Sequence, residues 1–317
     1  MKLENIGFYT LSDERAKNAS HTSPLHRCEM LLTKRCNFKC PYCRGVGPDK
    51  DATLDEAKSV VKMWADQGLK NVRFSGGEPT IWEGLKELVS YTKSLGVERI
   101  AISTNGSASK EFYSELVECG MNDVSISLDA CCAYTGDIMS GVKDSWNIII
   151  ENIKHLSALT YVTVGVVITD NNINELANIV KFAHDLGVAD IRIISAAQLS
   201  GIDIKIDIPD EIKNNHKILA YRLENLSNDR YVRGIQKCDT HKCPLVLDDM
   251  AVMDGKHYPC IIYMREGGTA IGDVGPNMRE ERLHWFENTD TSCDHICSKN
   301  CLDVCIDYNN RWNQYNL

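Results

Sequence analysis

The chain has 317 residues, 43% of them hydrophobic, which is enough to bury one large core and a smaller unit. Its formal net charge of -9 disfavours general nucleic-acid binding, because phosphate backbones select basic surfaces, but a nucleotide in a local pocket stays possible. No stretch approaches roughly eighteen consecutive apolar residues, and Met1–Asn5 lacks a signal-peptide pattern, so we expect no membrane association and a cytoplasmic location.

From residue 27 to residue 198 the sequence alternates short β-branched runs with amphipathic stretches, which predicts βα units with parallel strands. The predicted strands are Cys28–Thr33, Asn71–Ser75, Arg99–Thr104, Asp123–Leu128, Tyr161–Thr169 and Asp190–Ser195. The predicted helices are Leu54–Gln67, Trp82–Leu95, Ser109–Cys119, Lys143–Leu159 and Ile173–Leu186. Glycines follow several of these helices, as a left-handed C-cap requires.

Three cysteines, Cys36, Cys40 and Cys43, lie within eight residues after the first predicted strand. Three thiolates hold three corners of a 4Fe-4S cluster and leave one iron open, where a small molecule can be activated. Zinc sites close four ligands with paired short spacings and ferredoxins use C-x2-C-x2-C, so neither fits the spacing C-x3-C-x2-C. The loop therefore predicts a reactive cluster.

This motif resembles that of the radical S-adenosylmethionine (SAM) superfamily. The resemblance implies that the open iron binds SAM and that one electron cleaves it to a 5'-deoxyadenosyl radical, which takes a hydrogen atom from the substrate. It also implies an α/β fold with a partial (β/α)6 TIM-like barrel, whose active site lies at the C-terminal ends of the strands. Tyr42 occupies the aromatic position that covers the SAM adenine in many family members.

The stretch Ser75-Gly76-Gly77-Glu78-Pro79 follows the second predicted strand and resembles the family's Gly-Gly-Glu motif. Gly76 and Gly77 let the backbone approach a ligand closely, and Glu78 or a nearby carbonyl can receive an ammonium group. The resemblance implies that this stretch, including Pro79, binds the amino group of SAM.

Short polar side chains end the third and fourth predicted strands, at the expected catalytic rim. By resemblance they contact SAM or the substrate; they are Ser103, Asn105, Ser127 and Asp129. Such residues also cap the helices that follow strands, and this alternative stays open.

A vicinal pair, Cys131 and Cys132, follows the fourth predicted strand beside the expected SAM pocket. Because S–H bonds are weaker than most C–H bonds, we consider both as candidate catalytic residues that give a hydrogen atom to a substrate radical. Buried free cysteines more often only pack against their neighbours.

Seven more cysteines lie near the C-terminus: Cys238, Cys243, Cys260, Cys293, Cys297, Cys301 and Cys305. In a reducing compartment such thiols favour iron–sulfur clusters or zinc over disulfides. Cys243 and Cys260 form the pattern C-x11-G-x4-C with Gly255, which resembles the auxiliary-cluster module called SPASM, or its shorter form, twitch. The resemblance implies a β-hairpin carrying Gly255 and one or two auxiliary 4Fe-4S clusters; zinc is the alternative.

The last four cysteines recur every four residues. A straight helix would spread them over about 18 Å, too far for one cluster, so either the segment turns or its cysteines serve two clusters. The family arrangement implies two: Cys238, Cys243, Cys260 and Cys305 around the first, and Cys293, Cys297 and Cys301 around the second. The even spacing departs from the full SPASM pattern, so the second cluster is completed by Asp303, Asp307 or His295, or is absent.

We therefore predict four segments: an N-terminal extension (1–25), the barrel (26–200), a bridging segment (201–237) and an auxiliary-cluster domain (238–317). A helix is expected to start near Pro209 in the bridging segment.

The leading hypothesis is a radical SAM oxidoreductase or maturase that acts on a peptide or small molecule, with an electron donor such as flavodoxin or ferredoxin. The core also resembles the GTP cyclase of molybdopterin-precursor synthesis, through Ser75–Pro79, Thr104–Gly106 and Ser127–Ala130, so nucleotide or nucleoside modification is the alternative. Against it, the module's cysteine spacing differs from that enzyme's and the C-terminal diglycine is missing. A non-enzymatic iron–sulfur or zinc protein explains thiolates, but not three ligands on a barrel rim.

Overall fold

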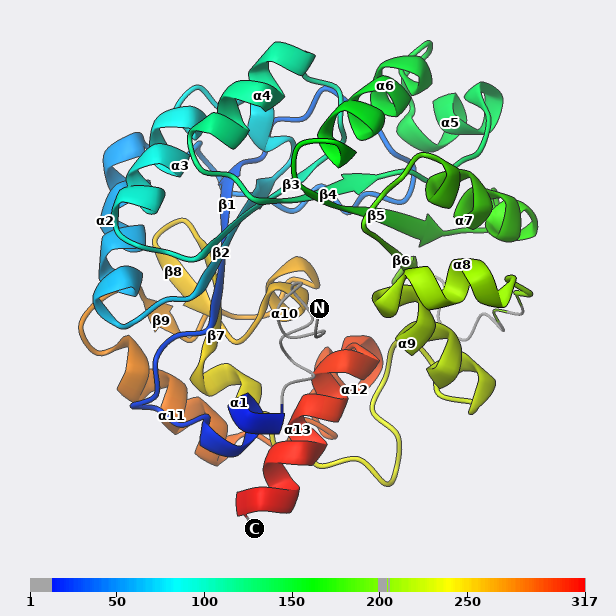
Figure 1. Cartoon of the computed structure of the whole chain (residues 1–317). Helices are drawn as coiled ribbons and strands as arrows, with labels where there is room; N and C mark the ends of the chain where they lie inside the picture. Colours follow the sequence, from blue (N-terminus) through cyan, green and yellow to red (C-terminus); the bar gives the residue numbers. More distant parts are fainter. Residues whose placement is uncertain (1–12, 199–203, 205, 317) are drawn as a thin grey trace.

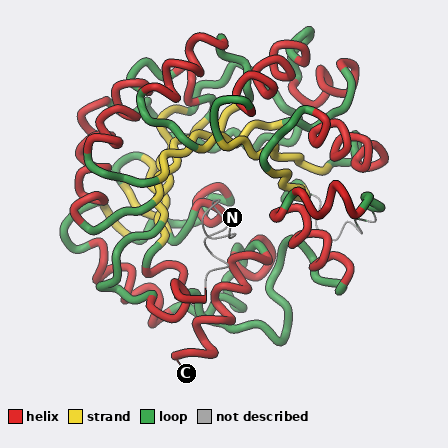
Figure 2. Tube along the Cα trace, viewed as in Figure 1, coloured by secondary structure: helices red, strands yellow, loops and turns green. Residues whose placement is uncertain are grey.

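The computed structural model describes residues 13–198, 204 and 206–316. The described strands form one nine-stranded sheet that curves around a central space, with helices along its convex side (Figures 1 and 2). The strand order is β6-β5-β4-β3-β2-β1-β7-β8-β9, and within these described residues β6 and β9 do not pair. The sheet is therefore an open, partial barrel, as predicted.

The first six strands pair in parallel, each with its neighbour in sequence. They are β1 (Arg27–Thr33), β2 (Asn71–Gly76), β3 (Arg99–Thr104), β4 (Asp123–Ser127), β5 (Tyr161–Ile168) and β6 (Asp190–Ser195). Every predicted strand is found, with its ends within one residue of the prediction.

Helices follow the strands on the outside of the sheet (Figure 1). They are α2 (Leu54–Asp66), α3 (Leu85–Ser94), α4 (Lys110–Glu118), α5 (Ala133–Ser140), α6 (Trp146–Ser157) and α7 (Leu176–Asp185), with 3-10 turns η3 (Pro79–Ile81) and η4 (Ile173–Glu175). Thr53 and Glu56 form a capping box at the start of α2. The sequence did not predict α5, whose first residue follows Cys132 without a side-chain cap.

The two faces of the barrel sheet differ in polarity because side chains alternate along each strand. The convex face carries fully buried residues such as Phe74 and Ile102, which pack in the main hydrophobic core. The concave face carries polar groups, including Arg73, whose Nη1 donates to Oγ of Ser103 across the sheet at 3.0 Å. A closed TIM barrel fills this space with branched apolar side chains, so here the lumen suits a polar ligand.

The C-terminal strands continue the same sheet. They are β7 (Asp249–Met253), which pairs in parallel with β1, and β8 (Lys256–Tyr258) and β9 (Gly272–Asp273), which pair antiparallel. The β7–β8 hairpin turns at Asp254 and Gly255, with φ of 51° and 68°, as a tight hairpin turn requires. The cysteine-rich segment is thus joined to the barrel by the hydrogen-bond ladder between β1 and β7.

The remaining elements lie around the open side of the barrel (Figure 1). They are α1 (Asp13–Asn18), α8 (Asp210–Asn215), α9 (Lys217–Ser227), η5 (Pro244–Leu247), α10 (Ile261–Arg265), α11 (Met278–Asn288), α12 (Cys297–Asn300) and α13 (Asp303–Asn316). Helix α1 packs on α13, where Ala16, Ala19 and Tyr308 share a small second core. The helix expected near Pro209 begins at Asp210. None of the helices in the described residues is long and apolar enough to cross a membrane.

Candidate active site

The loop after β1, residues 34–45, carries Cys36, Cys40 and Cys43 at the C-terminal edge of the sheet; we refer to it as the three-cysteine loop. Each of two thiols receives an amide hydrogen bond at 3.4 Å, Cys36 from Phe38 N and Cys43 from Gly45 N, which stabilises a thiolate. Burial raises the pKa of Cys40 to about 11, and the charges of Cys36 and Cys43 act on it in the same direction. Metal binding must therefore deprotonate the Cys40 thiol.

The number of these thiols matches a 4Fe-4S cluster that keeps one iron open. Among the residues that the structure describes, no three His, Cys, Asp or Glu side chains converge closely enough to hold one metal ion. A 4Fe-4S cluster binds each cysteine to a different iron and so spreads the sulfurs apart.

Gly76, the last residue of β2, and Gly77 pack directly on the backbone where β1 ends and the three-cysteine loop begins. Gly77 N donates to Thr33 O at 2.7 Å, and Glu78 N donates to Arg35 O at 2.9 Å. A Cβ atom would lie 2.3 Å from Thr33 O at Gly76 and 2.2 Å from Arg35 O at Gly77. Glycine is thus needed here for close contact between two loops, besides any approach to a ligand.

The Glu78 carboxylate lies inside this contact and has no exposed surface. Its Oε1 accepts hydrogen bonds from the Thr80 amide and from the Thr80 and Thr104 hydroxyls, and its Oε2 accepts one from Asn105 N at 2.7 Å. Burial raises its pKa, whereas these hydrogen bonds lower it. Because its oxygens are engaged, backbone carbonyls are the better acceptors for an ammonium group; Pro79 begins the turn η3 beside it.

The polar residues at the ends of β3 and β4 have different surroundings. Asn105 Nδ2 donates to Asn37 Oδ1 at 2.8 Å and lies 4.0 Å from Cys36 Sγ, so it borders the three-cysteine loop. Ser103 faces the lumen and accepts from Arg73, whereas Ser127 is exposed at the end of β4.

Tyr42 and Asp129 connect the three-cysteine loop to the end of β4. The Tyr42 hydroxyl donates to Asp129 Oδ2 at 2.5 Å, and Val167 N of β5 donates to Asp129 Oδ1 at 2.6 Å. Burial raises the pKa of Asp129 to about 6, while these hydrogen bonds lower it. Both oxygens of the Asp129 carboxylate thus accept hydrogen bonds from within the protein. The Tyr42 hydroxyl is thereby held in place in the three-cysteine loop.

The vicinal cysteines lie two and three residues beyond Asp129. Cys131 is half-buried, with its Sγ 3.9 Å from Glu175 Oε2, and Cys132 is exposed at the start of α5. Burial and the charge of Glu175 raise the pKa of Cys131, so its thiol keeps its hydrogen.

Five of the C-terminal cysteines gather in one place, which we call the cysteine nest: Cys243, Cys260, Cys297, Cys301 and Cys305. Burial raises the pKa of Cys301 first, and the charges of the other four raise it further. Cys238 and Cys293 are exposed. This grouping differs from the division that the family arrangement implied, which placed Cys297 and Cys301 at a separate cluster.

The reason for this grouping is a turn between α12 and α13. Helix α12 ends after one turn, and Cys301 follows with an extended backbone, φ -55° and ψ 136°. Cys305 then lies on α13, which begins at Asp303 after this break in the helix. Of the two options open from the sequence, the segment turns.

The lumen contains arginines that the sequence patterns did not single out. Arg192 of β6 has no carboxylate within ion-pair distance among the described residues, and its Nη2 lies 3.4 Å from Ser125 Oγ. Arg222 of α9 is fully buried; its Nη2 pairs with Asp303 at 3.2 Å, but its Nε and Nη1 lack a hydrogen-bond partner in the described part of the chain. Burial and the positive charges of Arg73 and Arg222 lower the pKa of Arg192 to about 10.

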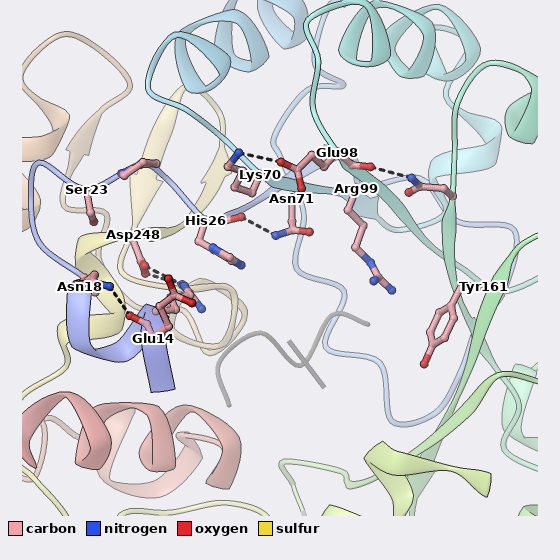
Figure 3. A pocket seen from close by; sticks show the side chains of 14 residues that line it. Glu14, Asn18, Ser23, His26, Lys70, Asn71, Glu98, Arg99, Tyr161 and Asp248 are labelled. Carbon is pink, nitrogen blue, oxygen red and sulfur yellow. Dashed lines mark hydrogen bonds and ion pairs between the residues drawn. The ribbon is translucent and has the colours of Figure 1, made fainter. Parts of the chain in front are cut away.

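A cavity of about 740 Å³ opens at the other end of the barrel (Figure 3). Its wall includes Asn71, Arg99 and Tyr161, which begin β2, β3 and β5, and Glu14 and Asn18 of α1. It therefore lies at the N-terminal ends of the strands, away from the three-cysteine loop.

Comparison with known proteins identifies the barrel. Residues 30–183 match the family model described as the Radical SAM superfamily. A Sulfurisphaera tokodaii protein named "Probable GTP 3',8-cyclase" is 28% identical over 202 residues, which cover 62% of this chain and 64% of the relative. A Saccharolobus solfataricus protein of the same name is 32% identical over 176 residues, which cover 54% and 57%. The chain thus spans less than two thirds of these curated relatives.

Two solved structures share the fold. Streptococcus suis SuiB bound to S-adenosylmethionine has a TM-score of 0.61 at 15% identity, with 86% of this chain and 67% of that chain covered. Native anSMEcpe with bound AdoMet has a TM-score of 0.61 at 15% identity, with 92% and 96% covered. In both, the likeness extends well beyond the residues of the family match.

Proposed function

This chain belongs to the radical SAM superfamily, and we propose that it cleaves SAM reductively and abstracts a hydrogen atom from a small-molecule or peptide substrate. The observation that carries the proposal is the three-cysteine loop, which β2, β3 and β4 hold in place through Gly77, Glu78 and Asp129. Cys36, Cys40 and Cys43 would hold the SAM-binding cluster, which supplies the electron that cleaves the sulfonium to a 5'-deoxyadenosyl radical.

The surrounding residues suit the binding of SAM. We assign Tyr42 to the adenine, since its hydroxyl is fixed by Asp129 and the residue directly precedes Cys43 in the loop. Backbone carbonyls beside Gly76 and Gly77 take the ammonium group, and Asn105 borders the open side of the loop.

We also assign one auxiliary 4Fe-4S cluster to the cysteine nest. Four of its five thiols suffice for one cubane, and Cys238 and Cys293 are outside the group. The charges of Arg27 and Asp249, which begin β1 and β7, act on the pKa of Cys305, so this cysteine lies near the N-terminal ends of these two strands. An auxiliary cluster there is placed to exchange an electron with a substrate radical in the lumen.

A nucleotide is the second candidate substrate, and the lumen arginines favour it. Arg192 and Arg222 offer guanidinium N–H groups without partners, and arginine suits phosphate recognition. Relatives named as probable GTP 3',8-cyclases point in the same direction.

Anaerobic reconstitution followed by SAM cleavage tests the activity. We expect 5'-deoxyadenosine from the wild-type chain and none from the triple variant Cys36→Ala/Cys40→Ala/Cys43→Ala. Deuterated peptides and nucleotides then identify the substrate by transfer of deuterium to 5'-deoxyadenosine. Absence of any SAM-dependent change in the EPR spectrum of the reduced, iron-loaded chain overturns the proposal.

The vicinal cysteines remain our candidates for the hydrogen-atom donor. Cys131→Ala/Cys132→Ala should keep SAM cleavage and lose product or its stereochemistry. Unchanged turnover and stereochemistry would exclude the pair.

A further inference from the structure

Glu266 joins two parts of the molecule that each carry thiols. It is the C-cap of α10, and its carboxylate forms an ion pair with Arg44, the residue directly after Cys43. At the other end of the same short helix, Cys260 of the cysteine nest is the N-cap, and its Sγ accepts from Tyr263 N at 3.4 Å. One helix of five residues thus connects the nest to the three-cysteine loop.

A second arginine, Arg233, lies close enough to this ion pair for its charge to interact with both partners. Arg233 donates from Nε to Ser195 O, at the end of β6, at 3.1 Å, and from Nη1 to Asn300 O, at the end of α12, at 3.3 Å. Burial lowers the pKa of Arg233 to about 10; the positive charge of Arg44 lowers it further, and the negative charge of Glu266 opposes both. The Glu266 carboxylate therefore pairs with Arg44 and also offsets the positive charge of Arg233.

The segment around Arg233 is itself tied to the nest by backbone hydrogen bonds. Gly234 N donates to Cys301 O at 2.9 Å, and Asp303 N donates to Val232 O at 3.1 Å. Any shift of this segment would move the backbone that carries Cys301. The segment that carries Arg233 is in this way fixed to the nest, whereas Arg44 belongs to the three-cysteine loop.

The ion pair between Arg44 and Glu266 is partly buried. The side chains of Arg44 and Glu266 are 26% and 15% exposed, so solvent screens the pair less than an exposed one. Without the carboxylate, the guanidinium groups of Arg44 and Arg233 would repel each other across a partly buried gap.

We propose that Glu266 is a positioning residue that sets the three-cysteine loop against the cysteine nest through Arg44 and Arg233. The proposal rests on SAM binding at the three-cysteine loop. It assigns Glu266 no contact with SAM: the residue acts by holding the loop, so its loss should weaken SAM binding while both sets of cysteines keep their iron.

The test compares Glu266→Gln, Arg44→Gln and the double variant, all reconstituted with iron and titrated with SAM by EPR. We expect each single variant to bind SAM about tenfold more weakly, at unchanged iron content, and the double variant to be no weaker than either single one. Glu266→Asp, which keeps the charge, should recover part of the loss. As a control, Glu115→Gln on the outer helix α4 removes the ion pair with Lys86, and this variant should bind SAM as the wild type does.

The outcomes separate this inference from the proposed function. Wild-type affinity in Glu266→Gln, or losses that multiply in the double variant, overturn the positioning role. If Glu266→Gln loses iron, the SAM affinity of Arg44→Gln is the test instead. Normal SAM affinity in Arg44→Gln also overturns the positioning role. A wild-type chain without any SAM-induced EPR change contradicts the proposed function instead.

Discussion

The hydroxyl of Tyr42 donates a hydrogen bond of 2.5 Å to the carboxylate of Asp129, so the three-cysteine loop is fastened to the end of β4. Asp129 Oδ1 in turn accepts from Val167 N of β5. A loop that precedes β2 in the sequence is therefore located by two later strands, and Asp129 works through Tyr42 and not by direct contact with the cysteines.

Loss of the hydrogen bond between Tyr42 and Asp129 should weaken SAM binding. Tyr42→Phe keeps the ring but loses the hydrogen bond, and we expect a loss of about 1.5 kcal/mol, or roughly tenfold in SAM affinity. Asp129→Asn should have a similar effect, and the two changes together should not add, because they remove one interaction. EPR titration with SAM measures this; Tyr134→Phe, an exposed tyrosine on α5, is the control. Additive losses would contradict the shared role.

Glu78 should be essential for the stability of the loop contacts. Glu78→Ala leaves the buried donors of Thr80, Thr104 and Asn105 N without their acceptor, so we expect a loss of about 3 kcal/mol or more in the free energy of unfolding. Anaerobic urea unfolding gives the value. Glu83→Gln, an exposed neighbour, should unfold at the wild-type midpoint, and an equal midpoint for Glu78→Ala would contradict the role.

Gly77 tests the close contact between the two loops. Its φ is not positive, so Gly77→Ala brings no backbone strain and only adds a Cβ atom 2.2 Å from Arg35 O. The loop must move, and we expect the variant to lose iron from the three-cysteine site. Gly275→Ala is the matched control, because its added Cβ atom would lie 3.9 Å from the nearest atom. Equal iron content in both variants would show that the contact at Gly77 tolerates an added Cβ atom.

The iron content of cysteine variants distinguishes one auxiliary cluster from two. One SAM-binding and one auxiliary cluster give about eight irons per chain. The double variant Cys260→Ala/Cys301→Ala leaves three thiols in the nest and should lower this to about four, whereas Cys238→Ala and Cys293→Ala should leave it unchanged. About twelve irons in the wild type, or a loss of iron with Cys293→Ala, would support a second auxiliary cluster.

Asp190 should make the stability of the fold depend on pH. It is buried at the start of β6, where it accepts from the amides of Ile218 and Leu219 on α9, and burial raises its pKa to about 6. Because the folded state then holds the proton more tightly than the unfolded one, this stabilisation is present below about pH 4 and is lost as the pH rises through 6.

Asp190→Asn should remove that dependence. We expect the wild type to lose on the order of 3 kcal/mol relative to the variant between pH 4 and 7.5, measured by urea unfolding. Asp185→Asn, an exposed carboxylate on α7, should keep the wild-type pH profile. Parallel profiles for the wild type and Asp190→Asn would refute the assignment.

Local patterns were sufficient to predict the barrel strands and the three-cysteine loop, because β-branched runs and cysteine spacing are features of neighbouring residues. The pairing of β7 with β1 was not predictable, since it joins Arg27 to Asp249 across the chain. The grouping of the nest depends on the backbone turn at Cys301, for which the even spacing of the cysteines gives no signal. Likewise, the motif suggested Glu78 as a ligand contact, and only the fold shows its carboxylate enclosed by Thr80, Thr104 and Asn105.

The ladder between β1 and β7 has one more consequence. The strand that leads into the three-cysteine loop is hydrogen-bonded to the strand that leads into the hairpin before Cys260. During turnover, β1 and β7 cannot move relative to each other and change the separation of two redox centres on either side of the ladder unless backbone hydrogen bonds break. The electron-transfer distance would then be a constant of the fold, and any gating must come from the substrate or from the side chains between the two centres.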